Sequence, residues 1–429
     1  MKIFLDTIGC RLNQAEIETI ARQFRSAGHE IVASAAQADL AVINTCTVTS
    51  EAASDSRAAI RRAKRLGASE VIATGCWATL EPDNASALPG VHWVIPNRQK
   101  DTLAAEILGM PQEFFDLEPL ARRPLPGLRQ RTRAFIKVQD GCNNACTFCI
   151  TTVARGTSRS CSIEEVLADI RSALAGGARE VVLTGVHLGS WGQDFEGSHG
   201  LGELISTILE RSSVPRLRLS SLEPWDLDSD FFGLWSDRRL CRHLHLPLQS
   251  GSPSVLKKMR RNITPSSFAA LVDSARTLIP EVAITTDVIV GFPGETQAEF
   301  DETADFVKFI HLAGGHVFTY SPRPGTPAAR MKDQVPYEIR KERNAQLRNI
   351  LAEAERAYKS RFIGKTLPVL WEAAAKGADQ GFQLEGLTDN YLRVTAEAPV
   401  PRWNELDEVE IKCSVDKGLA GNIVVPTKS

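Results

Sequence analysis

The chain has 429 residues, of which 43% are hydrophobic and 24% charged, and its formal net charge at pH 7 is −2. This length predicts two to four domains, since a single core rarely grows so large. The near-neutral charge excludes a generally polybasic protein, so a polyanionic partner has to meet a local positive patch. The sequence lacks the roughly 20-residue apolar stretch of a membrane span and a secretory signal pattern, so a cytoplasmic location and no membrane partner are expected.

The first predicted domain, residues 1–110, alternates short apolar runs with helical patterns. Strands are predicted at "KIFLDTIG", "LAVINTC" and "EVIATGC", and a helix over 13–28 is closed by Gly28. This alternation predicts a parallel sheet covered by helices, whose ligands gather at the carboxyl ends of the strands. Cys10, Cys46 and Cys76 each end one predicted strand. Three loops are therefore expected to bring these thiols to one edge of the sheet.

Residues 111–133 interrupt this pattern and are rich in proline and arginine. Between Ala121 and Arg133 there are five arginines and no acidic residue. Two interpretations stay open: a solvated linker, or a strip that contacts phosphates. The candidate RNA-binding residues are Arg122, Arg123, Arg129, Arg131 and Arg133.

A second strand–helix series is predicted over residues 134–362. Its six strand candidates are "AFIKVQDGC", "EVVLTGV", "RLRLSSL", "HLHLPLQ", "AITTDVIVGF" and "GGHVFTYS". Six strands with intervening helices predict a partial barrel rather than a closed eight-stranded one. The series ends with one long predicted helix, residues 337–362.

Residues 363–428 change to short alternating runs separated by turns, which predicts a small antiparallel β-barrel or sandwich. Residues 336–365 hold eight basic and four acidic side chains, a net +4, whereas residues 366–429 hold six basic and ten acidic, a net −4. An acidic domain is an unusual phosphate binder. We therefore expect the basic linker and long helix to contact an RNA backbone, and the barrel to read shape with a minority face.

The nine cysteines predict metal chemistry rather than disulfides in a reducing compartment. Cys142, Cys146 and Cys149 have C-x3-C-x2-C spacing. Thiolates select zinc or iron–sulfur clusters, and a structural zinc site is closed by four ligands. The nearest spare thiol, Cys161, lacks a paired spacing, whereas a cubane cluster held by three cysteines leaves one iron open. The spacing favours the cluster over zinc; Cys161, Cys241 and Cys413 are expected to be ordinary side chains.

The cysteine spacing with an aromatic before the last cysteine, Phe148, resembles that of radical S-adenosylmethionine enzymes. Further segments are similar to the methylthiotransferases: "GCRLNQAE", "NTCTVTSEA" and "GCWA" in the first domain, and "LTGVHLGSWG", "SSLEP", "HLPLQSGS", "TDVIVGFPGET" and "YSPRPGTPAA" in the second. The last domain resembles the TRAM domain, a small RNA-binding barrel. The "TGVHLGSWG" segment is most similar to the MtaB-like branch. "CITTVARG" lacks the family's usual proline, which puts the local loop shape in doubt.

The resemblance implies an α/β fold with an N-terminal parallel-sheet domain, a partial (β/α)6 radical S-adenosylmethionine barrel and a TRAM-like barrel. It implies two 4Fe-4S clusters: one on Cys142, Cys146 and Cys149, and an auxiliary one on Cys10, Cys46 and Cys76 that carries sulfide or polysulfide. S-adenosylmethionine would serve as methyl donor and radical source. Its implied contacts are Phe148, Thr184, Gly185, Ser221, Glu223, Gln249, Ser250, Val290 and Gly291.

The implied reaction inserts a methylthio group at C2 of N6-threonylcarbamoyladenosine 37 in tRNA and uses two S-adenosylmethionine per turnover. The implied partners are the anticodon stem-loop, a reductant such as flavodoxin or ferredoxin, and a sulfur-delivery system; a monomer is expected. Alternative acceptors are N6-isopentenyladenosine 37 in tRNA and a ribosomal-protein aspartate. A redox or regulatory RNA-binding protein with one structural metal site is the alternative from another class.

Five further side chains are open to two interpretations each. His187 either faces the substrate or is structural. His243 and His245 alternate along a strand, so at most one is expected to face the barrel interior. Arg260 and Arg261 are expected either to meet phosphate or to lie on a solvated face.

Overall fold

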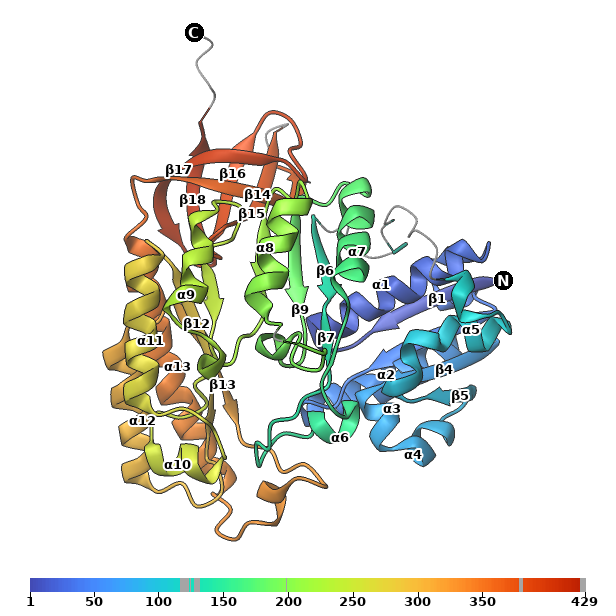
Figure 1. Ribbon diagram of the computed structural model, residues 1–429, viewed down its shortest axis with the longest axis horizontal. Helices are drawn as coiled ribbons and strands as arrows, with labels where there is room; N and C mark the ends of the chain where they lie inside the picture. The colour runs from blue at the N-terminus through green and yellow to red at the C-terminus, as the bar shows by residue number, and fades with distance from the viewer. Residues whose placement is uncertain (116–122, 124, 127–131, 198, 378–380, 425–429) are drawn as a thin grey trace. The chain divides into compact units, whose positions relative to one another are not determined.

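The computed structural model describes residues 1–115, 123, 125–126, 132–197, 199–377 and 381–424 (Figure 1). The chain forms two compact units. Unit 1 comprises residues 1–144, 149–177 and 181–212, and unit 2 comprises residues 145–148, 178–180 and 213–429. Unit 1 therefore combines the predicted first domain with the first part of the predicted second series. None of the described helices has the length and apolarity that a membrane crossing requires.

Unit 1 contains a five-stranded parallel sheet in the order β2-β1-β3-β4-β5. The three predicted strands are confirmed as β1 (Lys2–Thr7), β3 (Leu40–Thr45) and β4 (Glu70–Gly75), which are neighbours. All six residues of β3 are buried, as expected for a central strand covered on both faces. The edge strands β2 (Glu30–Val32) and β5 (Val91–Ile95) were not expected, because one is very short and the other exposes His92 and Trp93.

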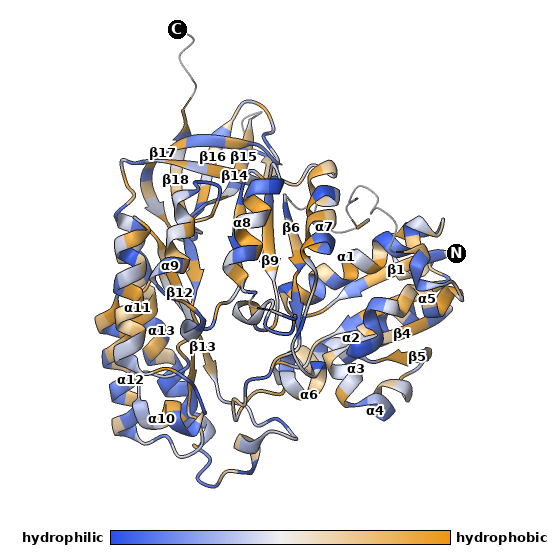
Figure 2. Cartoon of the chain, viewed as in Figure 1, coloured by the Kyte–Doolittle hydropathy of each residue, from blue (hydrophilic) through white to orange (hydrophobic). Residues whose placement is uncertain are grey.

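Helices cover both faces of this sheet. On one face, α1 (Arg11–Ser26) and α5 (Leu103–Leu108) bury an apolar stripe that includes Ile17, Ile20 and Phe24. On the other face lie α2 (Ser50–Leu66), α3 (Cys76–Leu80) and α4 (Pro82–Ser86). Much of the α2 ribbon has the hydrophilic colour in Figure 2, and its buried residues are mainly alanine and isoleucine. The predicted parallel α/β domain is thus confirmed.

The rest of unit 1 packs against α1. It comprises β6 (Arg133–Lys137), β7 (Gln139–Asp140), α6 (Thr151–Arg155), β8 (Arg159–Ser160), α7 (Ile163–Ala175), most of β9 (Glu180–Thr184) and α8 (Leu201–Arg211). Ala15 of α1 forms a small core with Phe135 and Val182. In Figure 2, β9 is mainly hydrophobic, and all five of its residues are buried.

Unit 2 continues the strand–helix series. Its strands are β10 (Leu217–Leu219), β11 (His243–His245), β12 (Ala283–Val290) and β13 (Gly314–Thr319). The last three form a parallel sheet, and isolated bridges join β10 and its following residues to the β11 segment. The helices are α9 (Ser229–Phe232), α10 (Pro253–Lys258), α11 (Pro265–Leu278), α12 (Gln297–Ile310) and α13 (Tyr337–Ser360). All six predicted strands of this series are present.

The last part of unit 2 is a closed five-stranded barrel in the order β14-β15-β16-β18-β17. Its strands are β14 (Thr366–Lys376), β15 (Phe382–Thr388), β16 (Arg393–Ala398), β17 (Leu406–Val415) and β18 (Gly418–Ile423). The pairs are antiparallel except for β16 with β18. Trp371, completely buried, lies in its core.

A turn between β15 and β16 attaches the barrel to the β10–β12 region of unit 2. Arg218 donates to the carbonyl oxygens of Thr388 (3.1 Å) and Asp389 (2.9 Å). Arg242 donates to both carboxylate oxygens of Asp389. Tyr391 stacks on His243 with ring centroids 4.3 Å apart. The barrel is therefore held by buried polar and aromatic contacts of its own unit.

Candidate active site

Three cysteines gather at the carboxyl edge of the parallel sheet in unit 1. Cys46 and Cys76 directly follow β3 and β4, and Cys10 precedes α1 three residues after β1. Each thiol is close enough to influence another electrostatically: Cys76 acts on Cys10, and both act on Cys46. The strand pattern thus predicts their common location correctly. Cys46 and Cys76 are buried, whereas Cys10 is exposed.

Two glycines make this close approach possible. Gly9 and Gly75 have φ angles of +98° and +95°, a region that side chains rarely adopt. A Cβ atom on Gly9 would lie 2.5 Å from Sγ of Cys46, and one on Gly75 would lie 2.3 Å from the carbonyl oxygen of Thr45. The glycines before Cys10 and Cys76 therefore let the loops turn and pack against the Cys46 segment.

Polar groups surround the three sulfurs. Asn97 donates to Sγ of Cys76 at 3.5 Å, and the Cys10 thiol donates to Oδ1 of Asn13 at 3.7 Å. Although Cys10 has exposed surface, the protein atoms packed around its sulfur displace water and raise the pKa of the thiol, an effect that the Arg155 guanidinium opposes. Burial likewise raises the pKa of Cys46, while nearby backbone N–H groups oppose it. The Asn97 amide and the backbone N–H groups beside Cys46 are donors of the kind that stabilise sulfur ligands of a cluster.

Each sulfur of the C-x3-C-x2-C loop also has a hydrogen-bond donor beside it. The ends of this loop belong to unit 1, where the N–H of Asn144 points to Sγ of Cys142 and the N–H of Thr151 to Sγ of Cys149, both at 3.4 Å. Its middle belongs to unit 2, where Arg261 donates to Sγ of Cys146 at 3.7 Å. The one-turn helix α6 starts where the family's proline is missing.

Both cysteine sets fit iron–sulfur clusters by the softness and number of their donors. Within the described ranges, no group of three or more Cys, His, Asp or Glu side chains is already drawn together to hold a metal ion. Burial raises the pKa of the Cys161 thiol to about 12. Cys241 is buried near Glu180, and Cys413 is exposed on β17. The ligand roles of both sets stay predictions.

The expected cofactor contacts occupy strand ends and turns in each unit. In unit 1, Thr184 ends β9 and Gly185 lies against the side chain of Gln139. In unit 2, Phe148 packs beside a cluster that includes Met259 and Phe292. Ser221 makes a β-bridge with His245.

The turns after β11 and β12 hold the other expected contacts. Gln249 has a φ of +69°, which is uncommon for a residue with a side chain and typical of a constrained functional turn. Ser250 is fully buried on Thr303, and Val290 is fully buried. The Gly291 N–H donates to Glu295 at 2.6 Å, which stabilises this turn.

Arg261 does not lie on a solvated face, so that expectation is wrong. Its guanidinium donates to both oxygens of Glu223, at 3.1 and 2.6 Å, and lies 4.4 Å from the ring centroid of Trp225. Only 2% of its side chain is exposed. Burial between a carboxylate and an aromatic ring keeps this cation away from bulk solvent and beside Cys146.

The expectation that at most one of His243 and His245 faces the barrel interior is also wrong in its reasoning. Residues two apart in a strand point to the same face. Both imidazoles contact the hydroxyl of Thr285, at 3.0 and 2.9 Å. His187 is buried. Its backbone N–H donates to the side-chain oxygen of Gln139 at 2.8 Å, and its ring Nδ1 lies 3.4 Å from the side-chain amide of Asn144.

The structure describes two of the five candidate RNA-binding arginines, Arg123 and Arg133. Arg122, Arg129 and Arg131 lie outside the described residues. Arg123 is exposed, and its carbonyl accepts a hydrogen bond from Arg25. Arg133 is half-buried as the first residue of β6.

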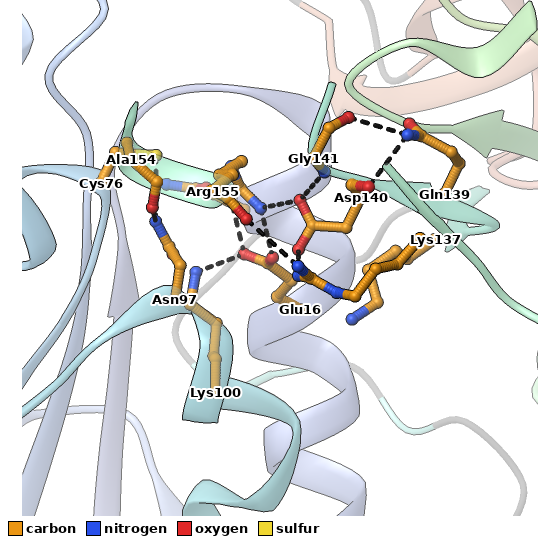
Figure 3. Close-up of polar contacts among 12 residues, drawn as sticks. Glu16, Cys76, Asn97, Lys100, Lys137, Gln139, Asp140, Gly141, Ala154 and Arg155 are labelled. Atoms are coloured by element: carbon orange, nitrogen blue, oxygen red, sulfur yellow. Dashed lines mark hydrogen bonds and ion pairs between the residues drawn. The ribbon is translucent and has the colours of Figure 1, made fainter. Parts of the chain in front are cut away.

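A buried charged network in unit 1 was missed by sequence reasoning (Figure 3). Arg155 contacts Glu16 and Asp140, and Lys100 contacts Glu16. One signal was available: Asn13 and Glu16 stand on the stripe of α1 that continues as Ile20, so polar residues occupy positions facing the protein interior.

Comparison with known proteins agrees with this architecture. The Radical SAM superfamily matches residues 136–307, and the "Uncharacterized protein family UPF0004" matches residues 2–95. A radical S-adenosylmethionine methyltransferase, TsrM, from Kitasatospora setae has a similar fold, with a TM-score of 0.58 and 16% sequence identity over 76% of this chain and 77% of that one. The fold and the C-x3-C-x2-C loop define a radical S-adenosylmethionine enzyme, a class that uses a 4Fe-4S cluster and S-adenosylmethionine.

Sequence relatives narrow the class. A protein of Bacillus subtilis named threonylcarbamoyladenosine tRNA methylthiotransferase MtaB is 37% identical over 94% of this chain and 92% of its own length. A protein of the same name from Thermotoga maritima is 37% identical over 97% of this chain and 95% of its own length. A tRNA-2-methylthio-N(6)-dimethylallyladenosine synthase of Maricaulis maris is 30% identical over 100% and 98%. The chain belongs to the radical S-adenosylmethionine methylthiotransferase family.

Proposed function

We propose that this chain inserts a methylthio group at C2 of N6-threonylcarbamoyladenosine 37 of tRNA, and that each turnover uses two molecules of S-adenosylmethionine. The observation that carries the proposal is the gathering of Cys10, Cys46 and Cys76 at one sheet edge, in a chain that also has the C-x3-C-x2-C loop. Two sets of three thiolates provide for two clusters with an open iron each. Relatives at 37% identity named for this nucleoside support the acceptor.

The residues of this chain would bind and orient these groups. When bound, the clusters and S-adenosylmethionine supply the electron, the methyl group, the sulfur and the hydrogen-abstracting radical. Asn97 and Asn13 hold the loops of Cys76 and Cys10. Arg261 orients Glu223 as a candidate contact for S-adenosylmethionine. The protein thus positions the reacting groups, while the cofactors supply the difficult chemistry.

RNA binding is proposed to depend on the arginines of residues 122–133 and on the exposed basic side chains of α13. Two arginines of α13 bind other groups of the protein. Arg343 is buried and forms an ion pair with Glu295 at 2.7 Å, and Arg340 donates a hydrogen bond to the carbonyl of Tyr320. The helix therefore offers fewer phosphate contacts than its net charge suggests. Neutralising Arg122, Arg123, Arg129, Arg131 and Arg133 together should weaken tRNA binding and flatten its salt dependence; unchanged affinity would refute the linker's role.

The acceptor is tested by mass spectrometry of tRNA nucleosides from cells with and without this protein. A methylthio-threonylcarbamoyladenosine signal that disappears with the gene supports the proposal. Loss of methylthio-isopentenyladenosine instead would support the second candidate, which the 30% identical dimethylallyladenosine-modifying relative favours. A reductant and a sulfur-delivery system are proposed as further partners.

A further inference from the structure

A cluster of four buried charges lies inside unit 1 (Figure 3). It consists of Glu16 on α1, Lys100 in the short helix of residues 97–102, Asp140 on β7 and Arg155 at the end of α6. The side chains are between 2% and 7% exposed. Two positive and two negative charges are therefore withdrawn from water together, which is costly unless each charge has close partners.

Arg155 is the centre of the cluster. Its Nη1 lies 2.8 Å from Glu16 and 2.9 Å from Asp140, and its Nη2 lies 2.7 Å from Oδ1 of Asn13. Lys100 completes the cluster at 2.7 Å from Glu16. Only a planar fork with several donors can satisfy three acceptors in these directions, which is why a lysine would not replace this arginine.

In one direction the cluster reaches the three cysteines at the sheet edge. The Asn13 side-chain oxygen accepts from Arg155, and the Asn13 side-chain amide donates to the carbonyl of Thr45, the residue before Cys46. The backbone N–H of the same Asn13 donates to the Cys10 sulfur. Asn97 bridges Sγ of Cys76 and the carbonyl of Ala154, the residue before Arg155. One or two hydrogen bonds thus connect Arg155 to all three cysteine loops.

In the other direction the cluster reaches the two ends of the C-x3-C-x2-C loop. Asp140 accepts from Arg155 and, at 2.7 Å, from the N–H of Gly141. The N–H of Cys142 donates to the carbonyl of Gly156 at 3.0 Å. Arg155 itself stands six residues after Cys149, in the helix that follows the loop. The same guanidinium therefore braces both predicted cluster-binding regions.

We propose that Arg155 is a positioning residue that sets the Cys10, Cys46 and Cys76 loops against the two ends of the C-x3-C-x2-C loop that belong to unit 1, and that its charge stabilises the anionic thiolate site. The inference rests on the proposed two-cluster function. An apolar core would hold these segments as well or better, so stability alone does not explain four buried charges at this place. Transfer between two sites depends on their separation, and a shift of about 1 Å costs roughly a hundredfold in rate.

The first experiment measures the auxiliary site alone. In a chain with Cys142, Cys146 and Cys149 all changed to alanine, iron content, loss of iron to a chelator and the midpoint potential are compared for Arg155, Arg155→Gln and Arg155→Lys. Arg155→Gln should give a more negative potential and faster iron loss, because a nearby positive charge favours the reduced, more anionic cluster. Arg155→Lys should stay close to the parent in potential. Identical potentials and iron loss for all three would refute the electrostatic part.

The second experiment uses the full enzyme and measures 5′-deoxyadenosine formed per methylthio product. Arg155→Lys should raise this ratio by at least about tenfold, since the radical forms but the sulfur site is misplaced. Arg22→Lys is the matched control, because Arg22 joins α1 to Asp169 of α7 at 2.6 Å and contacts none of the cysteine loops. An unchanged ratio in Arg155→Lys would refute the positioning role.

Glu16→Gln tests the same proposal if the Arg155 variants fail to fold. It keeps the shape and most hydrogen bonds of the site, and it should raise the same ratio without altering the circular dichroism of the apoprotein. A normal ratio in folded Glu16→Gln would overturn the proposal even if the Arg155 variants were unfolded. A parent enzyme that holds two clusters but forms no methylthio product would refute the proposed function instead, and the first experiment would still decide the charge effect of Arg155.

Discussion

Asp389 supplies the carboxylate among the contacts that attach the terminal barrel in unit 2 to Arg242. It accepts hydrogen bonds from Nε and Nη2 of Arg242, at 2.6 and 3.0 Å, and Arg242 also pairs with Glu281 at 2.9 Å. Burial alone would raise the pKa of Asp389, but the Arg242 guanidinium more than offsets this and lowers it. The change Asp389→Asn removes the charge and one strong acceptor while it keeps the shape of the turn.

The expected loss of stability is about 2 kcal/mol. Removing one partner of a fully buried ion pair costs roughly 3–5 kcal/mol, and a hydrogen bond to a charged group contributes about 1.5–3 kcal/mol. The lower range applies because 13% of the Asp389 and 26% of the Arg242 side chain are exposed, and because Arg242 keeps Glu281. For a unit of this size, such a loss lowers the midpoint of unfolding by about 4–8 °C.

Differential scanning calorimetry measures this shift, and limited proteolysis after α13 detects release of the barrel. The matched control is Asp237→Asn, since Asp237 pairs with Arg239 at 2.6 Å but both side chains are about a third exposed. A surface pair contributes under about 1 kcal/mol. If Asp389→Asn shifted the midpoint no more than Asp237→Asn and left proteolysis unchanged, the proposed anchoring by the turn would be refuted.

Three further predictions concern the cysteines, the glycines and pH. Cys10→Ala should keep reductive cleavage of S-adenosylmethionine and lose sulfur insertion, whereas Cys146→Ala should lose both; equal product from Cys10→Ala, measured by nucleoside mass spectrometry, would exclude the auxiliary site. Gly75→Ala should destabilise unit 1 by more than about 1 kcal/mol and reduce bound iron from about eight toward four per chain, because its Cβ would lie 2.3 Å from the Thr45 backbone. Iron content and stability equal to those of the parent would contradict this. Gly109→Ala is the control for the positive φ, because the space around Gly109 is open. The pKa values of Glu281 and Asp389 lie below their ordinary values of 4.5 and 3.8, so their stabilising effect is complete above about pH 4.5 and is lost as pH falls through the lowered values. The free energy of unfolding, measured by denaturant titration from pH 6 to pH 2, should fall in the parent and fall less in Asp389→Asn. If the free energies of the two proteins fell in parallel with pH, Asp389 would not contribute to this pH dependence.

Much of the fold was predictable from local pattern. The alternation of short apolar strands with helices in residues 1–110 and 134–362, and the change to short β segments after residue 363, correspond to the observed sheets and barrel. The edge strands β2 and β5 were not predicted, because a strand of three residues and one with exposed aromatic side chains carry little pattern. Strand pairing compensates for this weak pattern, and pairing is a property of the assembled sheet.

The candidate site was also predictable only in part. Cys142, Cys146 and Cys149 lie within one segment of eight residues, so their spacing alone indicates a cluster loop. Cys10, Cys46 and Cys76 could be associated because parallel strands end at one edge. Arg261 and Arg155 could not be assigned, since an arginine in a sequence has no mark that distinguishes a solvated side chain from one buried among carboxylates.

The order of elements, the soft sulfur ligands and the family resemblance were determined by the sequence itself, because periodicity, residue chemistry and spacing are local properties. The tertiary structure decided which charges are buried and which segments they join. Glu16, Lys100, Asp140 and Arg155 are distant in the chain and ordinary in composition. Only packing, which removes water and leaves each charge dependent on its neighbours, turns these four residues into a brace between the cysteine loops.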